Sequence, residues 1–169
     1  MLPTLKSWLA GRRVAATLAV LAAVLGIAAG SLVVTGARVL AAQADLPEVV
    51  VYKTPTCGCC SLWVAHLRDA GFKVRVTDRD DLGDIRREWK VPAKMAACHT
   101  ARVGRYVIEG HVPAADIRRL LQDQPRVDGL AVPGMPIGSP GMEQGERVEP
   151  YDVLGFNAAG ETRVFASHR

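Results

Sequence analysis

Three of the four cysteines of this 169-residue chain lie within four residues, at Cys57, Cys59 and Cys60, and the fourth is Cys98. Cys57 and Cys60 form a C-x-x-C pair, the spacing found in thiol-disulfide oxidoreductases. The pair follows a short valine-rich run and precedes a stretch with helical spacing, so it is predicted to lie on a strand-to-helix turn. Backbone amides and the helix dipole at such a turn favour the thiolate, which is both a nucleophile and a metal ligand.

Cys59 helps to distinguish thiol-disulfide exchange from metal binding as the chemistry of this motif. A redox dithiol needs only two sulfurs, and Cys59 inside the motif would compete for any disulfide that Cys57 and Cys60 form. Three thiolates within four residues instead converge on one point, an arrangement that suits a soft cation such as Cu(I). A thiol-disulfide oxidoreductase that uses the Cys57/Cys60 pair is the alternative.

Two purely structural roles compete with these. Four cysteines in an exported protein often form two disulfides. That pairing would join Cys57 to Cys60 and leave Cys59 to reach Cys98, because adjacent cysteines pair with each other only under strain. A structural zinc site also suits four thiolates, but zinc usually takes its ligands from two separated pairs, whereas the spacing here is three plus one.

The elements that would position the cysteines alternate between strand and helix over residues 45–123. In chain order, the patterns predict a strand at 49–52, a helix at 59–70, a strand at 74–77, a helix around 82–89, strands at 98–103 and 106–108, and a helix from Pro113. Gly71 is placed to end the first helix. This order is that of thioredoxin and glutaredoxin, so we predict an α/β, thioredoxin-like fold.

The fold prediction brings the fourth cysteine to the other three. In a thioredoxin-like fold, the loop that leads into the third strand lies against the C-x-x-C turn, and Cys98 falls at the entry to that strand. We therefore predict a metal site formed by Cys57, Cys59, Cys60 and Cys98. The sequence offers three further donors, but nothing in it fixes their direction: His99, Met135 and Met142.

The last part of the chain, residues 124–169, has a different character. The Pro/Gly-rich stretch at 133–142 cannot form regular helix or strand, because prolines remove backbone donors and glycines relax the backbone. Two β-rich runs, 151–156 and 162–165, flank the turn at 157–161. We predict a loop followed by a β-hairpin, as a C-terminal extension of the domain.

The N-terminal 44 residues have the layout of an export signal. A basic start precedes an uncharged apolar run at 14–37 and a small-residue stretch that ends in Ala42-Gln43-Ala44, so cleavage would leave Asp45 first. The run is also long enough for a membrane anchor. Either interpretation places residues 45–169 in the periplasm as one domain, attached to the membrane only through such an anchor.

The net charge of +4 comes from this leader. Its four basic residues account for the whole excess, and the rest of the chain is neutral. A nucleic-acid partner therefore loses its main electrostatic support.

The sequence resembles the periplasmic, thioredoxin-like copper-resistance proteins of the CopG type, a family long catalogued as a domain of unknown function. The stretches that carry the resemblance span about 50–143 and are 52–60, with its CGCC motif, then 98–101, 109–113, 133–136 and 138–143. The resemblance implies a multinuclear copper(I) cluster held by Cys57, Cys59, Cys60 and Cys98. It further implies a role in copper tolerance that involves copper oxidation or reduction, so that other periplasmic copper-handling or redox proteins are expected partners.

Overall fold

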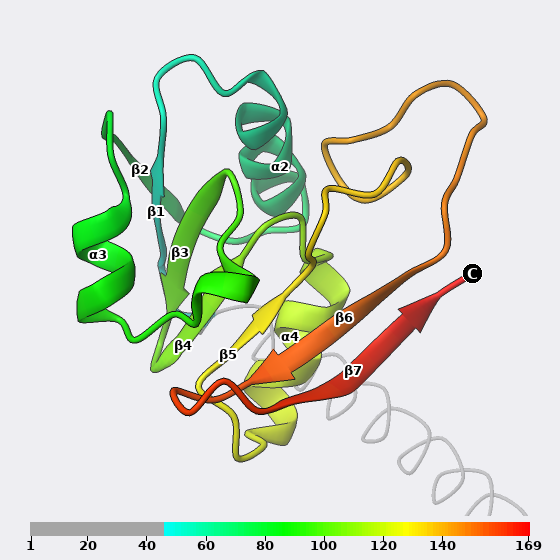
Figure 1. Cartoon of the computed structure of the whole chain (residues 1–169). Coiled ribbons are helices and arrows are strands. Elements are labelled where there is room, and N and C mark those ends of the chain that lie inside the picture. The colour runs from blue at the N-terminus through cyan, green and yellow to red at the C-terminus, as the bar shows by residue number, and fades with distance from the viewer. Residues whose placement is uncertain (1–45) are drawn as a thin grey trace, which may run out of the picture. The chain divides into compact units, whose positions relative to one another are not determined.

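The computed structural model describes residues 46–169, so the predicted signal or anchor at 1–44 lies outside the described residues. Figure 1 shows the arrangement of the elements. In chain order they are β1 (Val49–Lys53), α2 (Gly58–Asp69), β2 (Val74–Asp78), α3 (Gly83–Glu88), the 3-10 helix η1 (Ala93–Met95), β3 (His99–Val103), β4 (Tyr106–Glu109), α4 (Ala114–Asp123), β5 (Gly129–Ala131), β6 (Tyr151–Phe156) and β7 (Thr162–His168). Within residues 46–169, no helix has the length and apolar character needed to cross a bilayer.

The strands form one mixed sheet in the order β2-β1-β3-β4-β5-β6-β7. β1 is parallel to β2 and antiparallel to β3, and β3 is antiparallel to β4. In this register Lys53, the last residue of β1, pairs with His99, the first residue of β3. The turn after β1 and the loop before β3 therefore meet at one edge of the sheet, as the sequence predicts.

Helix α2 begins and ends on residues that the sequence marks. Cys57 is its N-cap residue, with an extended backbone, and its sulfur accepts a hydrogen bond from the backbone N–H of Cys60. At the other end Gly71 has a φ of +86°, and its N–H and that of Phe72 bond back to the last helical carbonyls. A glycine takes this left-handed conformation at little cost, so the helix stops there.

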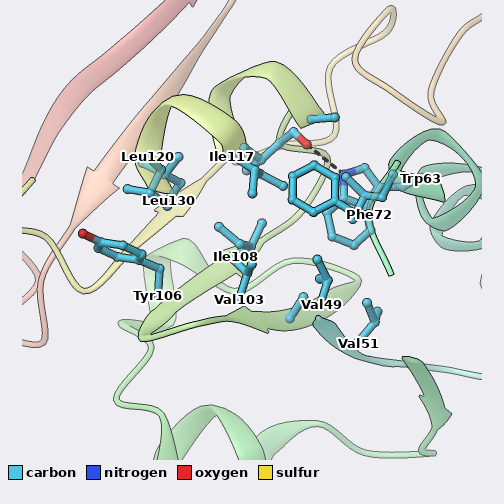
Figure 2. Packing of buried hydrophobic residues seen from close by; sticks show 14 of the residues in the cluster. Val49, Val51, Trp63, Phe72, Val103, Tyr106, Ile108, Ile117, Leu120 and Leu130 are labelled. Carbon is cyan, nitrogen blue, oxygen red and sulfur yellow. Dashed lines mark hydrogen bonds between the residues drawn. The ribbon is translucent and has the colours of Figure 1, made fainter. Parts of the chain in front are cut away.

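Two apolar clusters cover the two faces of the sheet. On one face, α2 and α4 pack on β1, β3, β4 and β5, and Figure 2 shows Trp63 of α2 and Ile117 of α4 in this cluster. On the other face, Met95 of η1 packs with Val107 and Phe156. Val107 and Ile108 are neighbours in β4 and belong to different clusters, because successive side chains in a strand point to opposite faces.

The C-terminal extension joins the same sheet. The predicted hairpin is present as β6 and β7, with β7 reaching three residues further than predicted, to His168. β5 was not predicted from the sequence, and it links the hairpin to β4. The Pro/Gly-rich stretch at 133–142 forms neither helix nor strand, as predicted. The irregular segment between β5 and β6 covers 132–150 and contains one isolated bridge; we call residues 133–149 the cover segment.

Candidate metal centre

The turn after β1 carries three of the predicted ligands. Cys57 and Cys60 form a disulfide with their Cα atoms 5.4 Å apart. Cys60 is fully buried, whereas Cys57 and Cys59 are partly exposed. The sulfurs of Cys57 and Cys59 lie 3.5 Å apart. The C-x-x-C pair is therefore oxidised, and the third cysteine of the motif lies directly against it.

Cys98 lies just before β3 and completes the predicted set. Together with Cys59 it is a free cysteine in the described part of the chain. The sulfurs of Cys57, Cys59, Cys60 and Cys98 all lie within 4.8 Å of one another. Burial, followed by the neighbouring Cys59, raises the pKa of the Cys98 thiol to about 11. This thiol stays protonated near neutral pH unless a cation stabilises its thiolate.

A buried ion pair that the sequence analysis did not identify holds the peptide before Cys98. The Glu109 carboxylate accepts a hydrogen bond of 3.0 Å from the N–H of Ala97, and the Arg86 guanidinium donates to the Ala97 carbonyl. Arg86 Nε lies 3.4 Å from Glu109, which is fully buried. Burial raises the pKa of Glu109 to about 7. A glutamate at the end of the apolar run Tyr106–Ile108 is the sequence signal for such a residue.

Two fully buried histidines lie on the other side of Cys98. The Cys98 sulfur is 3.6 Å from His99 Nδ1 and 3.4 Å from His111 Nε2. Burial lowers the pKa of His99 to about 3 and also lowers the pKa of His111, so both imidazoles are neutral. Trp63 stacks on His99 with ring centroids 4.2 Å apart. The sequence analysis named His99 as a further donor of undetermined direction and assigned no role to His111.

The cover segment packs directly on this cluster. Its Pro140 carbonyl accepts a hydrogen bond of 2.7 Å from His111 Nδ1. Gly141, with a φ of +85°, is so close to α2 that an added Cβ would lie 2.7 Å from the Cys59 carbonyl oxygen. Of the two methionines named as candidate donors, Met142 is half-buried beside this contact and Met135 is 42% exposed.

His66 on α2 gives the fold a dependence on pH. Its Nε2 accepts a hydrogen bond of 3.0 Å from the N–H of Ala114, at the start of α4. Burial lowers the pKa of His66, against the opposing effects of Glu143 and Asp69. The neutral ring is therefore the folded form, and its contribution is present above the unfolded pKa of about 6.5 and lost as pH falls below it.

We expect this loss to be about 1 kcal/mol or less, since one hydrogen bond on a partly exposed side chain is involved. Urea unfolding at pH 7.5 and pH 5.5 measures it, with His66→Gln as the comparison. His99 and His111 titrate in both proteins, so the smaller pH dependence of His66→Gln isolates the contribution of His66. An identical pH dependence in the two proteins would contradict the assignment.

Comparisons with known proteins return one family and one kind of solved structure. The family described as "Protein of unknown function, DUF411" matches residues 95–142, which include Cys98, both buried histidines and much of the cover segment. Two solved structures, forms 1 and 2 of the copper resistance protein CopG, are each 40% identical to the chain with a TM-score of 0.69. They match 73% and 74% of this chain and 98% and 100% of their own. No curated protein matches the chain.

Proposed function

The chain belongs to the family of the copper resistance protein CopG, and on this premise we propose that it is a copper-binding protein of copper resistance and homeostasis. The thiolates of Cys57, Cys59, Cys60 and Cys98 hold Cu(I) in a multinuclear cluster. The observation that carries the proposal is the gathering of these four sulfurs within 4.8 Å of one another. Thiolate is the ligand type that selects Cu(I), and a sulfur can bridge two ions.

The strand order supports a thioredoxin-like assignment for residues 46–123. β1 and β2 are parallel, β3 and β4 follow antiparallel, and α2 and α4 cover one face. In this arrangement the first helix of the fold carries the reactive cysteines at its N-terminus. The cover segment and the β6–β7 hairpin are then an extension that contributes to one side of the site.

The location follows from the leader. Residues 1–44 serve as a signal peptide or membrane anchor, and residues 45–169 work in the periplasm. There the partners are copper ions and other periplasmic copper-handling or redox proteins, and nucleic acid is not among them because the net charge of the chain comes from the leader.

The disulfide supports a redox role as a copper oxidoreductase. When the thiols of Cys57 and Cys60 form the S–S bond, they release two electrons and two protons. Two Cu(II) ions can each take one electron and become Cu(I), the state that thiolates bind. The reverse balance oxidises copper and restores the dithiol, so the same pair can interconvert the two ions in either direction.

The second candidate is a thiol-disulfide oxidoreductase. The observation that favours it is a disulfide at the N-terminus of α2 with Cys57 partly exposed and Cys60 buried, an asymmetry that leaves one sulfur open to an attacking thiol. This candidate uses two cysteines only. It therefore gives no role to Cys59 or Cys98.

A Cu(I) titration of the purified protein, reduced and kept anaerobic, tests the proposal. We expect several Cu(I) ions per chain, lost when all four cysteines are changed to serine. Cys59→Ser and Cys98→Ser alone should each lower the copper content, because each removes one sulfur of the cluster. The single variants also provide the control, since a dithiol enzyme would keep its disulfide exchange in both. Equal copper binding by the four-serine variant would overturn the proposal.

A further inference from the structure

We propose that Cys98, His99 and His111 form a metal site of their own, which binds one copper ion through one sulfur and two imidazole nitrogens whether Cys57 and Cys60 are oxidised or reduced. The choice of copper rests on the proposed function, whereas the donor set does not. The three donor atoms belong to the loop before β3, to β3 itself and to the segment between β4 and α4. They lie within 4.8 Å of one another.

The two sulfur–nitrogen distances match those between the ligands of a metal ion. In a tetrahedral site with metal–sulfur and metal–nitrogen bonds of about 2.3 and 2.0 Å, a sulfur and a nitrogen ligand lie about 3.5 Å apart. The observed distances from the Cys98 sulfur are 3.6 Å to His99 Nδ1 and 3.4 Å to His111 Nε2. An ion at bonding distance from the Cys98 sulfur can therefore also reach the facing nitrogen of either imidazole.

The proton positions on both imidazoles leave the nitrogen that faces Cys98 unprotonated and able to bind a metal ion. A carbonyl oxygen can only accept, so His99 Nε2 donates to the Gly110 carbonyl at 2.9 Å and His111 Nδ1 donates to the Pro140 carbonyl at 2.7 Å. The other nitrogen of each neutral ring then carries a lone pair toward Cys98. Such carbonyl bonds are the usual outer partners that orient histidine ligands in metal sites.

The arrangement is incomplete as a hydrogen-bond network. The Cys98 thiol has one proton, while two buried lone pairs face its sulfur. The thiol can donate to one imidazole only, and the second nitrogen is left without a donor in a site where both rings are fully buried. An unpaired buried acceptor costs free energy. A cation satisfies both nitrogens and the sulfur at once.

This donor set differs from the four-cysteine cluster in what it can hold. One thiolate with two imidazoles accepts both Cu(I) and Cu(II), whereas sulfur alone strongly favours Cu(I). Neither Cys57 nor Cys60 belongs to it. The site can therefore bind one ion while Cys57 and Cys60 form a disulfide. Cys98 is a ligand in both this site and the four-cysteine cluster.

The test uses the full chain with Cys57→Ser, Cys59→Ser and Cys60→Ser, which leaves Cys98 as the only thiol. We expect it to bind one Cu(I) ion per chain under anaerobic conditions, with one sulfur and two nitrogens in the X-ray absorption spectrum. A further Cys98→Ser or His111→Gln change removes a ligand and should weaken binding by roughly 100-fold or more. The loss of a group that only hydrogen-bonds to a ligand typically costs about 10- to 100-fold. His168→Gln, which removes a histidine outside the site, should leave binding unchanged.

The outcomes separate this site from the cluster. If the unsubstituted reduced protein binds Cu(I) but the three-serine variant binds none, the separate site is overturned and the four-cysteine proposal stands. Binding that persists after Cys98→Ser also overturns the separate site. Cys98→Ser keeps both imidazoles and their carbonyl bonds, so this comparison holds even if His111→Gln fails to fold.

Discussion

Reduction of the Cys57–Cys60 disulfide is expected to raise the affinity of the protein for Cu(I) by about a thousandfold or more and to increase the number of ions bound per chain. The disulfide removes two of the four proposed sulfur ligands, because a disulfide sulfur is no longer a thiolate. A four-ligand structural zinc site gains roughly 10–16 kcal/mol on binding. On the same scale, the loss of half of the ligands costs on the order of 5 kcal/mol of binding free energy. This corresponds to a change in Kd of more than about 1000-fold.

Competition with a Cu(I) chelator measures the difference between the oxidised and the reduced protein. Linkage requires the reciprocal effect, so bound Cu(I) should shift the equilibrium of the Cys57/Cys60 pair toward the dithiol. The control is the variant with Cys57→Ser, Cys59→Ser and Cys60→Ser, which keeps one cysteine and cannot form a disulfide within the chain, so the reductant should change nothing. Equal affinities of the oxidised and reduced proteins would show that these two sulfurs are not ligands.

Gly141→Ala is expected to detach the cover segment from α2 and to lower the free energy of unfolding by roughly 2–5 kcal/mol. A left-handed backbone costs a non-glycine residue about 1–2 kcal/mol, and overpacking of a tight contact about 1–3 kcal/mol more. At Gly141 both apply, because φ is +85° and a Cβ would lie 2.7 Å from the Cys59 carbonyl oxygen and from the Trp63 amide nitrogen. Both atoms belong to the backbone of α2, which cannot move aside cheaply.

Gly134→Ala is the matched control for this prediction. Gly134 lies in the same segment with a similar φ of +81°, but no atom lies within 4 Å of an added Cβ. Gly134→Ala should therefore lower the free energy of unfolding only by the cost of the left-handed backbone. Urea unfolding of the two variants gives the difference that belongs to the contact between Gly141 and α2. Equal destabilisation by the two substitutions would show that this contact contributes nothing.

The parts of the fold that the sequence predicts are those encoded in local patterns. The run of valines predicts β1, and Gly71 predicts the end of α2. Each of these signals occupies only a few consecutive residues. The clustered cysteines predict a metal site because three of them fall within four residues on one turn. Cys98 could be placed beside them because β3 pairs with β1 in the predicted order.

The parts that the sequence did not reveal depend on contacts between distant residues. β5 is three residues long, and its pairing with β6 joins positions about 25 residues apart in the chain. His111 meets Cys98 only because β3 and β4 form a hairpin, and its orientation depends on the carbonyl of Pro140, 29 residues away. No pattern of hydrophobicity or spacing near His111 contains that information.

The stacking of Trp63 on His99 places a fluorescent side chain beside the proposed metal centre. The indole is fully buried, its Nε1 donates to the Val112 carbonyl at 2.9 Å, and its ring lies 4.2 Å from the imidazole that faces Cys98. Fluorescence from a buried indole responds to charge and to electron acceptors within a few ångströms. We therefore expect the emission of Trp63 to change when copper binds at the proposed centre.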